Sequence, residues 1–165
     1  MTVERESEIL PFWEPKAGLA LNFIGSARWK RMLLEDAIQI ATEAHRGQTG
    51  RDGAPYILHP LRVMQNAASP QERIVAVLHD VVERSAWTLD GLKRRGLPDD
   101  LAAAVDALTR RDGEDYPDFV QRAGRNRLGR SVKRLDLQDH IAHATGASAA
   151  QLAKYETALA SLRSD

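Results

Sequence analysis

Apolar residues recur at helical spacing along most of this chain. From Trp29 onward they fall three or four positions apart, a period that places them on one face of an α-helix. The first such run contains Met32, Leu33, Ala37, Ile40, Ala41 and Ala44. The strict alternation typical of β-strands is absent, so the pattern predicts an all-α protein.

Glycine, proline and capping residues divide this pattern into separate helices. The three glycines and one proline of residues 47–55 predict a loop. Pro60 suits the first turn of a helix that runs to about Ala67. Ser69 and Pro70 begin the next helix, which we expect to continue without a break through residues 74–83. Further helices are predicted at residues 89–95, 98–108, 116–123, 127–142 and 148–162, about seven or eight in all.

The chain of 165 residues fits one domain, because domains typically contain about 100–150 residues. We predict a compact helical bundle over residues 29–165, preceded by an arm, residues 1–28, to which the sequence assigns no role. The last helix is expected to pack inward rather than form a dimer interface. The sequence does not decide between a monomer and a homodimer.

Composition and charge exclude several classes of protein. With 23 basic and 23 acidic residues the chain lacks the basic surplus of nucleic-acid-binding proteins. The absence of cysteine excludes disulfides, thiolate zinc sites and a cysteine nucleophile. No apolar run approaches the roughly 18 residues of a membrane span, and the acidic N-terminus does not resemble a signal peptide. We therefore expect a cytoplasmic protein.

The chemistry of the chain centres on His79 and Asp80, which interrupt an apolar run. Burying an imidazole and a carboxylate without partners costs several kcal/mol, and a divalent metal accepts both donor types. His59 and Asp136 are two further candidate donors. The four together suit Mn²⁺, Fe²⁺, Mg²⁺ or Zn²⁺.

The backbone context of two of these donors can be predicted. His59 precedes Pro60, so we expect its backbone outside the α region, at the edge of the preceding loop. Asp136 has an alternative role, because it can form an ion pair with Lys133 or Arg134.

Several segments of the chain, by their residues and by their order along it, resemble the HD superfamily of metal-dependent phosphohydrolases. Within it, the chain is most similar to the hydrolase domain of Rel/Spo-type enzymes and to the small alarmone hydrolases. The matching segments are residues 44–48, 51–60, 78–83, 87–89, 108–110 and 132–136.

This resemblance implies an all-α fold of the HD-domain type that binds one divalent metal, commonly Mn²⁺. The enzymes it resembles remove the 3′-pyrophosphate from guanosine tetra- and pentaphosphate (ppGpp and pppGpp), so the implied partner is a small nucleotide. By motif position the implied metal ligands are His59, His79, Asp80 and Asp136. Arg51, Gly53 and Tyr56 match the region that receives the base and ribose, and His45 matches a structural position.

The resemblance also suggests catalytic residues. Glu83 follows the metal motif by about one helical turn and is the expected general base. The family usually has an acid at the next position, where this chain has Arg84, which can either bind a substrate phosphate or neutralise Glu83. His140 stands where the family typically has a substrate-binding asparagine, and Gly50 replaces a residue that is often basic.

The sequence therefore predicts a metal-dependent phosphohydrolase of a guanosine 3′-diphosphate alarmone. Three alternatives stay open at this point: a phosphohydrolase of a different metabolite, an HD-type protein that binds a nucleotide without turnover, and a metal-free helical interaction module.

Overall fold

Helix boundaries in the protein follow its capping residues. The computed structural model describes residues 31–162. Ser69 and Glu72 form a capping box, in which the Ser69 hydroxyl accepts from the Glu72 N–H at 3.1 Å and the Glu72 carboxylate accepts from the Ser69 N–H at 3.3 Å. Side chains of Thr88, Asn126 and Ser148 each accept from a backbone N–H in the first turn of a further helix, without the reciprocal bond of a capping box.

The described residues contain nine helices and no strand; an isolated bridge joins Thr49 to Pro55. The all-α prediction is confirmed, whereas the arm predicted for residues 1–28 lies outside the described residues. The helices are α1 Leu34–Ala44, α2 Leu58–Gln65, α3 Pro70–Leu78, α4 Val81–Arg84, α5 Leu89–Arg94, α6 Asp99–Leu108, α7 Tyr116–Arg125, α8 Arg127–Ala142 and α9 Ala149–Ser161.

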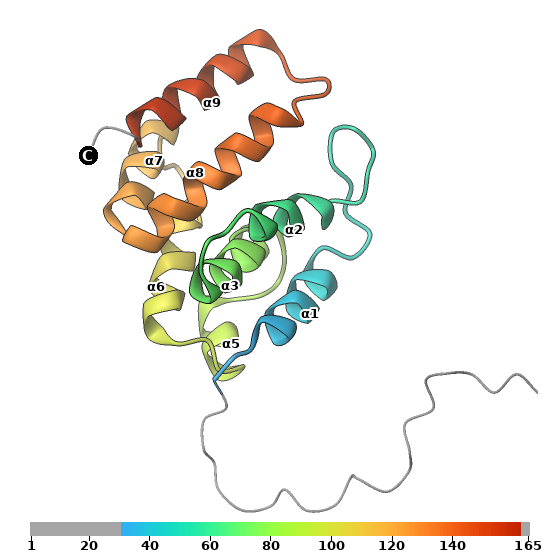
Figure 1. Cartoon of the computed structure of the whole chain (residues 1–165), viewed down its shortest axis with the longest axis vertical. Helices are drawn as coiled ribbons and strands as arrows, with labels where there is room; N and C mark the ends of the chain where they lie inside the picture. The colour runs from blue at the N-terminus through green and yellow to red at the C-terminus, as the bar shows by residue number, and fades with distance from the viewer. Residues whose placement is uncertain (1–30, 163–165) are drawn as a thin grey trace, which may run out of the picture.

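The core forms around α3 and α8. Val75, Ala76, Val77 and Leu78 of α3 are completely buried, and α3 packs against α1, α2, α6 and α8. Figure 1 shows α8 crossing the molecule between α9 and the α2–α3 pair, and it contacts all three. A helix in this position can bring side chains from one face into contact with several distant segments.

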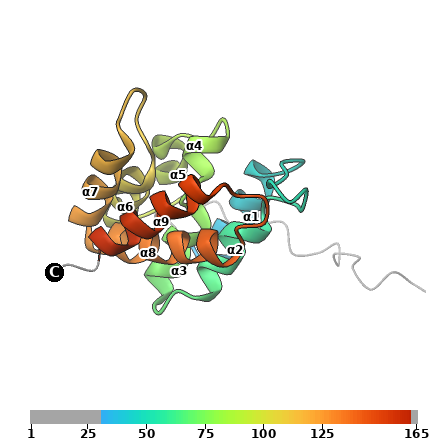
Figure 2. The same ribbon diagram turned by 90° about the horizontal axis from the view of Figure 1, so that it is seen from above.

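The C-terminal helix packs inward, as predicted. Ala158 and Leu159 of α9 are buried, as is Leu162 just after it, and they form a second apolar cluster with Phe119, Val120 and Leu137. α9 lies against α8 in both views (Figures 1 and 2). Among the helices of residues 31–162, none combines the length and hydropathy that crossing a bilayer requires.

The predicted continuous helix through residues 74–83 is wrong, because it breaks at His79 and Asp80. α3 ends at Leu78 and α4 begins at Val81, with Asp80 at φ −101° and ψ −3°. The His79 ring nitrogen Nδ1 lies 2.7 Å from the Ala76 carbonyl oxygen. An unbroken helix would offer this carbonyl to the N–H of residue 80, so the ring competes with the backbone at this point.

The predicted backbone of His59 is also wrong. His59 is the second residue of α2 rather than the last residue of the loop, and Pro60 is the third. Proline is tolerated there because the first N–H groups of a helix have no acceptor inside it. The first helix also begins later than predicted, at Leu34, where the Asp36 carboxylate accepts from the Leu33 N–H at 3.0 Å.

Truncating a core residue away from the metal-ligand candidates tests this packing. Leu101 of α6 is 1% exposed. We expect Leu101→Ala to lower the free energy of unfolding by about 2–5 kcal/mol, because it removes buried methyl groups and leaves a cavity. Urea denaturation measures this change. The control is Leu58→Ala, at a position that is 43% exposed, with an expected change within about 0.5 kcal/mol. Equal losses in the two variants would contradict the described core.

Candidate metal centre

Three segments that are distant in the sequence bring their polar side chains together in the interior. His59 comes from α2, His79 from the α3–α4 junction and Asp136 from α8, and one potential ligand atom of each lies within 4.8 Å of the others. His59 Nε2 is 3.2 Å and His79 Nε2 is 3.7 Å from Asp136 Oδ1. All three residues are buried.

Asp80 lies beside this group. Its Oδ2 atom is 3.4 Å from His79 Nε2 and 4.0 Å from His59 Nε2. The structure thus brings all four predicted donors into one place, although Asp80 and His79 follow each other across a helix break.

The donor atoms themselves fit a divalent metal. His59 Nε2, His79 Nε2 and Asp136 Oδ1 are all buried and have no hydrogen-bond partner. Leaving one such atom unpaired costs about 1–3 kcal/mol, so three of them facing one another need a common partner. Imidazole nitrogens and carboxylate oxygens are joint ligands of Zn²⁺, Fe²⁺ and Mn²⁺.

The opposite nitrogen of each ring fixes its tautomer. The His79 Nδ1 faces a carbonyl, which can only accept, so the ring donates from Nδ1 and leaves a lone pair on Nε2. The His59 Nδ1 lies 2.8 Å from Asp139 Oδ2, and Asp139 also accepts two hydrogen bonds from Arg62 at 2.7 and 2.9 Å. In its neutral form each ring therefore presents an unprotonated Nε2 to the centre, as metal ligands do.

Asp139 and Arg62 were not predicted from the sequence. Asp139 follows Asp136 by three residues on α8, and Arg62 follows His59 by three residues on α2, so each lies on the same helix face as a predicted ligand. That spacing was the available signal.

The electrostatics of the group favour added positive charge. Burial acts to raise the pKa of Asp136, but the ammonium of buried Lys133, 2.8 Å from Oδ2, and the neighbouring histidine rings together outweigh it and hold that pKa well below its usual range. Burial acts to lower the pKa of His59, but the carboxylates of Asp136 and Asp139 outweigh it and raise that pKa to about 9. The Lys133 ion pair considered for Asp136 thus exists, and it leaves the second oxygen facing the histidines.

A cavity of about 360 Å³ opens beside the group. Residues of the loop before α2 and of the loop that joins α8 to α9 line it. These two loops lie near each other in the fold (Figure 1). Of the residues predicted to bind substrate, Arg51, Tyr56 and His140 line it. Gly53 does not; it has a φ of +76° in the turn that shapes the first loop.

Arg84 also lines this cavity and lies against the metal-ligand candidates. Its guanidinium carbon is 4.4 Å from the centroid of the Tyr56 ring, and its Nε is 3.4 Å from Asp80 Oδ2. The Tyr56 hydroxyl donates a hydrogen bond to the same Asp80 oxygen. Arg84 is therefore held by an aromatic face and a carboxylate at the mouth of the site.

Glu83 and His45 have different surroundings. The exposed carboxylate of Glu83 accepts a hydrogen bond from the backbone N–H of Arg110 at 3.1 Å. The buried His45 ring lies 3.1 Å from the Gln48 side-chain oxygen and packs against Tyr56. Neither belongs to the group of residues that approach one another within 4.8 Å.

Comparisons with known proteins show which enzymes this chain is similar to. The chain is 33% identical over 116 residues to a probable GTP pyrophosphokinase of Mycobacterium leprae, which covers 68% of this chain and 14% of that protein. It is 30% identical over 97 residues to a guanosine-3′,5′-bis(diphosphate) 3′-pyrophosphohydrolase of Vibrio cholerae, covering 56% of this chain and 14% of that protein. The chain is a Rel/Spo homologue.

The homology covers a small part of these relatives, since the chain spans 14% of the length of each. No family model matches the chain. The present chain is also similar in structure to a metazoan orthologue of SpoT that hydrolyses ppGpp. The TM-score is 0.66 at 18% identity, and the match covers 85% of this chain and 88% of the other. The predicted HD-type helical fold is therefore confirmed.

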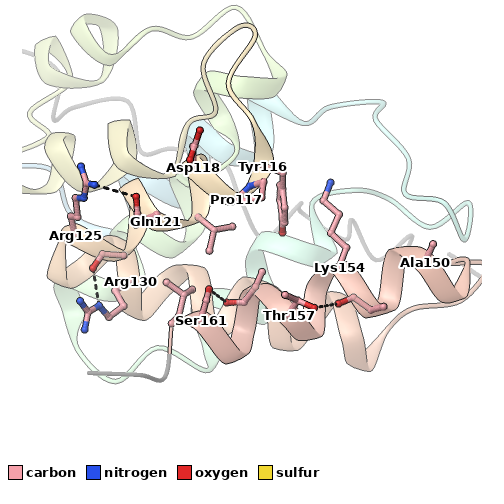
Figure 3. A pocket seen from close by; sticks show the side chains of 15 residues that line it. Tyr116, Pro117, Asp118, Gln121, Arg125, Arg130, Ala150, Lys154, Thr157 and Ser161 are labelled. Carbon is pink, nitrogen blue, oxygen red and sulfur yellow. Dashed lines mark hydrogen bonds between the residues drawn. The ribbon is translucent and has the colours of Figure 1, made fainter.

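The protein described here has a second, larger cavity of about 670 Å³ between α7 and α9, shown in Figure 3. Tyr116, Lys154, Arg125 and Arg130 lie around it, and none of the predicted site residues lines it. Size alone therefore does not identify the site; the converging donor atoms do.

Removing the Asp139 carboxylate charge tests the arrangement around His59. We expect Asp139→Asn to weaken Mn²⁺ binding about 10–100-fold, because it removes the ionic partner that orients the ring. Isothermal titration calorimetry measures the affinity. The control is Asp118→Asn, at an exposed position on α7. An unchanged affinity in Asp139→Asn would contradict a role for this carboxylate.

Proposed function

We propose that this chain is a divalent-metal-dependent phosphohydrolase that removes the 3′-pyrophosphate from a guanosine 3′-diphosphate alarmone such as ppGpp. The observation that carries the proposal is the set of buried, unpartnered ligand atoms of His59, His79 and Asp136 beside a cavity with arginines at its edge. The names of the relatives supply the substrate class.

The metal is Mn²⁺ by resemblance, held by His59, His79, Asp80 and Asp136. When bound, it supplies a Lewis acid that offsets charge on the phosphoryl oxygens and lowers the pKa of water. Asp136 keeps its charge because Lys133 stabilises the ionised form. The tautomers set by Ala76 and Asp139 keep both ring lone pairs directed at the ion.

Positive side chains bind the anionic substrate. The Arg84 side chain is 46% exposed and lines the cavity, so its guanidinium is accessible to a diphosphate bound there. A guanidinium binds phosphate oxygens with two parallel hydrogen bonds. Arg51 and Tyr56 of the loop before α2 receive the base and ribose, and Gly53 shapes this loop. The cavity volume of about 360 Å³ lies within the range of small-molecule sites.

Glu83 accepts the proton of the attacking water in this proposal. It lies on α4, which begins directly after Asp80, about one helical turn from the metal-ligand residues. For this role its carboxylate exchanges the N–H of Arg110 for a water molecule.

A second candidate function is nucleotide binding without turnover. It is favoured by the contact between Arg84 and Asp80, at 3.4 Å, because a guanidinium at this place competes with the metal for the carboxylate. The two functions share a ligand and differ only in whether product forms.

An assay for ppGpp hydrolysis in the presence of Mn²⁺ separates the two functions. We expect release of pyrophosphate by the wild-type chain and its loss in Asp80→Asn, which removes one charged donor. The control Asp90→Asn, at an exposed residue of α5, should retain the full rate. Binding of ppGpp by the wild type without release of pyrophosphate would support the second function and contradict the first.

The substitution Glu83→Gln separates proton transfer from metal binding. We expect the rate of hydrolysis to fall about 10²–10⁴-fold, the usual contribution of a general base, while the metal content measured by elemental analysis stays the same. A rate equal to the wild type would remove Glu83 from the mechanism.

A further inference from the structure

One oxygen of Asp136 is surrounded by three imidazole rings rather than two. The Nε2 atoms of His59, His79 and His140 lie 3.2, 3.7 and 3.1 Å from Asp136 Oδ1. His140 is therefore as close to this oxygen as the two histidines that the metal motif contains. It is also on the same face of α8, one turn after Asp136.

These short distances are not hydrogen bonds. Asp136 Oδ1 is buried and has no hydrogen-bond partner, although three ring nitrogens surround it. His79 and His59 donate from Nδ1 to the Ala76 carbonyl and to Asp139, so their neutral Nε2 atoms carry no proton to donate to this oxygen. Nitrogens that lie close to a carboxylate oxygen and leave it without a hydrogen-bond donor are placed as ligands of a shared cation are placed.

The orientation of the His140 ring is set from both sides. The ring stacks on His59 with centroids 4.5 Å apart and an angle of 24°, and on Tyr155 of α9 with centroids 5.0 Å apart and an angle of 14°. The Tyr155 hydroxyl in turn accepts a hydrogen bond from the Gln151 amide at 2.9 Å. His59 of α2 and Tyr155 of α9 thus hold the orientation of a ring that is 34% exposed near the end of α8.

We propose that His140 is a third imidazole donor to the metal ion, in addition to His59, His79, Asp80 and Asp136. This inference rests on the metal site of the proposed function and replaces the predicted role of His140 in substrate binding. A third nitrogen donor makes the site softer than a site with two histidines and two carboxylates. It therefore shifts the preference away from Mn²⁺ and towards Zn²⁺, Co²⁺ and Fe²⁺.

Metal binding without substrate tests the proposal. We compare the wild type with His140→Asn and His140→Gln, using calorimetric titration with Zn²⁺ and with Mn²⁺ and the visible absorption of the Co²⁺-loaded protein. The expected result is a loss of Zn²⁺ affinity of about tenfold or more in both variants, a smaller loss for Mn²⁺, and a changed Co²⁺ spectrum. Gln138→Ala, at an exposed position of α8, is the control and should match the wild type.

The outcomes separate this inference from the proposed function. If both His140 variants keep their helical circular dichroism, their Zn²⁺ affinity and their Co²⁺ spectrum, His140 is not a ligand and the proposal is overturned, while the proposed function stands. If instead the wild type binds none of the three metals, the proposed function and this inference fail together. Using two replacements of different size distinguishes a lost ligand from a local packing defect, because only a lost ligand changes the Co²⁺ spectrum in both.

Discussion

The buried carboxylate of Asp136 is the constraint on which the arrangement of the site depends. A carboxylate in the interior needs compensation from every direction, because isolated burial of its charge is strongly unfavourable. Lys133 supplies one partner at 2.8 Å, and Lys133 itself lies 4.7 Å from the centroid of the Phe119 ring. The other oxygen faces the histidines of α2 and of the α3–α4 junction. The central position of α8 and the convergence of the donor side chains therefore both serve to compensate the buried charge of Asp136.

Much of the fold was accessible from the sequence because helical periodicity and capping are local properties. Ser69, Thr88 and Ser148 each begin a helix where the pattern predicted one. The break at His79 was not accessible in this way. It depends on a side chain that takes a carbonyl from its own backbone, and the apolar run on both sides favours an uninterrupted helix.

The candidate site was predictable as a set of residues but not as a network. Motif order identified His59, His79, Asp80 and Asp136, and the structure brings them together. The partners that orient them come from tertiary packing: Asp139 approaches His59 only because α8 crosses α2. The same holds for Arg84, whose position over the Tyr56 ring depends on a loop more than twenty residues earlier in the chain. The sequence alone identified Arg84 as a departure from its relatives, and the structure shows that the aromatic ring and Asp80 accommodate it.

The candidate donors His79 and His59 differ in what anchors them, and this has a consequence for how the protein can change. His79 is fixed by the main-chain carbonyl of Ala76, which is present whatever side chains surround it. His59 is fixed by the side chains of Asp139 and Arg62, each of which a single codon change can replace. One half of the site is thus robust to mutation and the other half is adjustable. Natural variation or laboratory evolution can change the metal affinity of this candidate site through residues that are not themselves ligands.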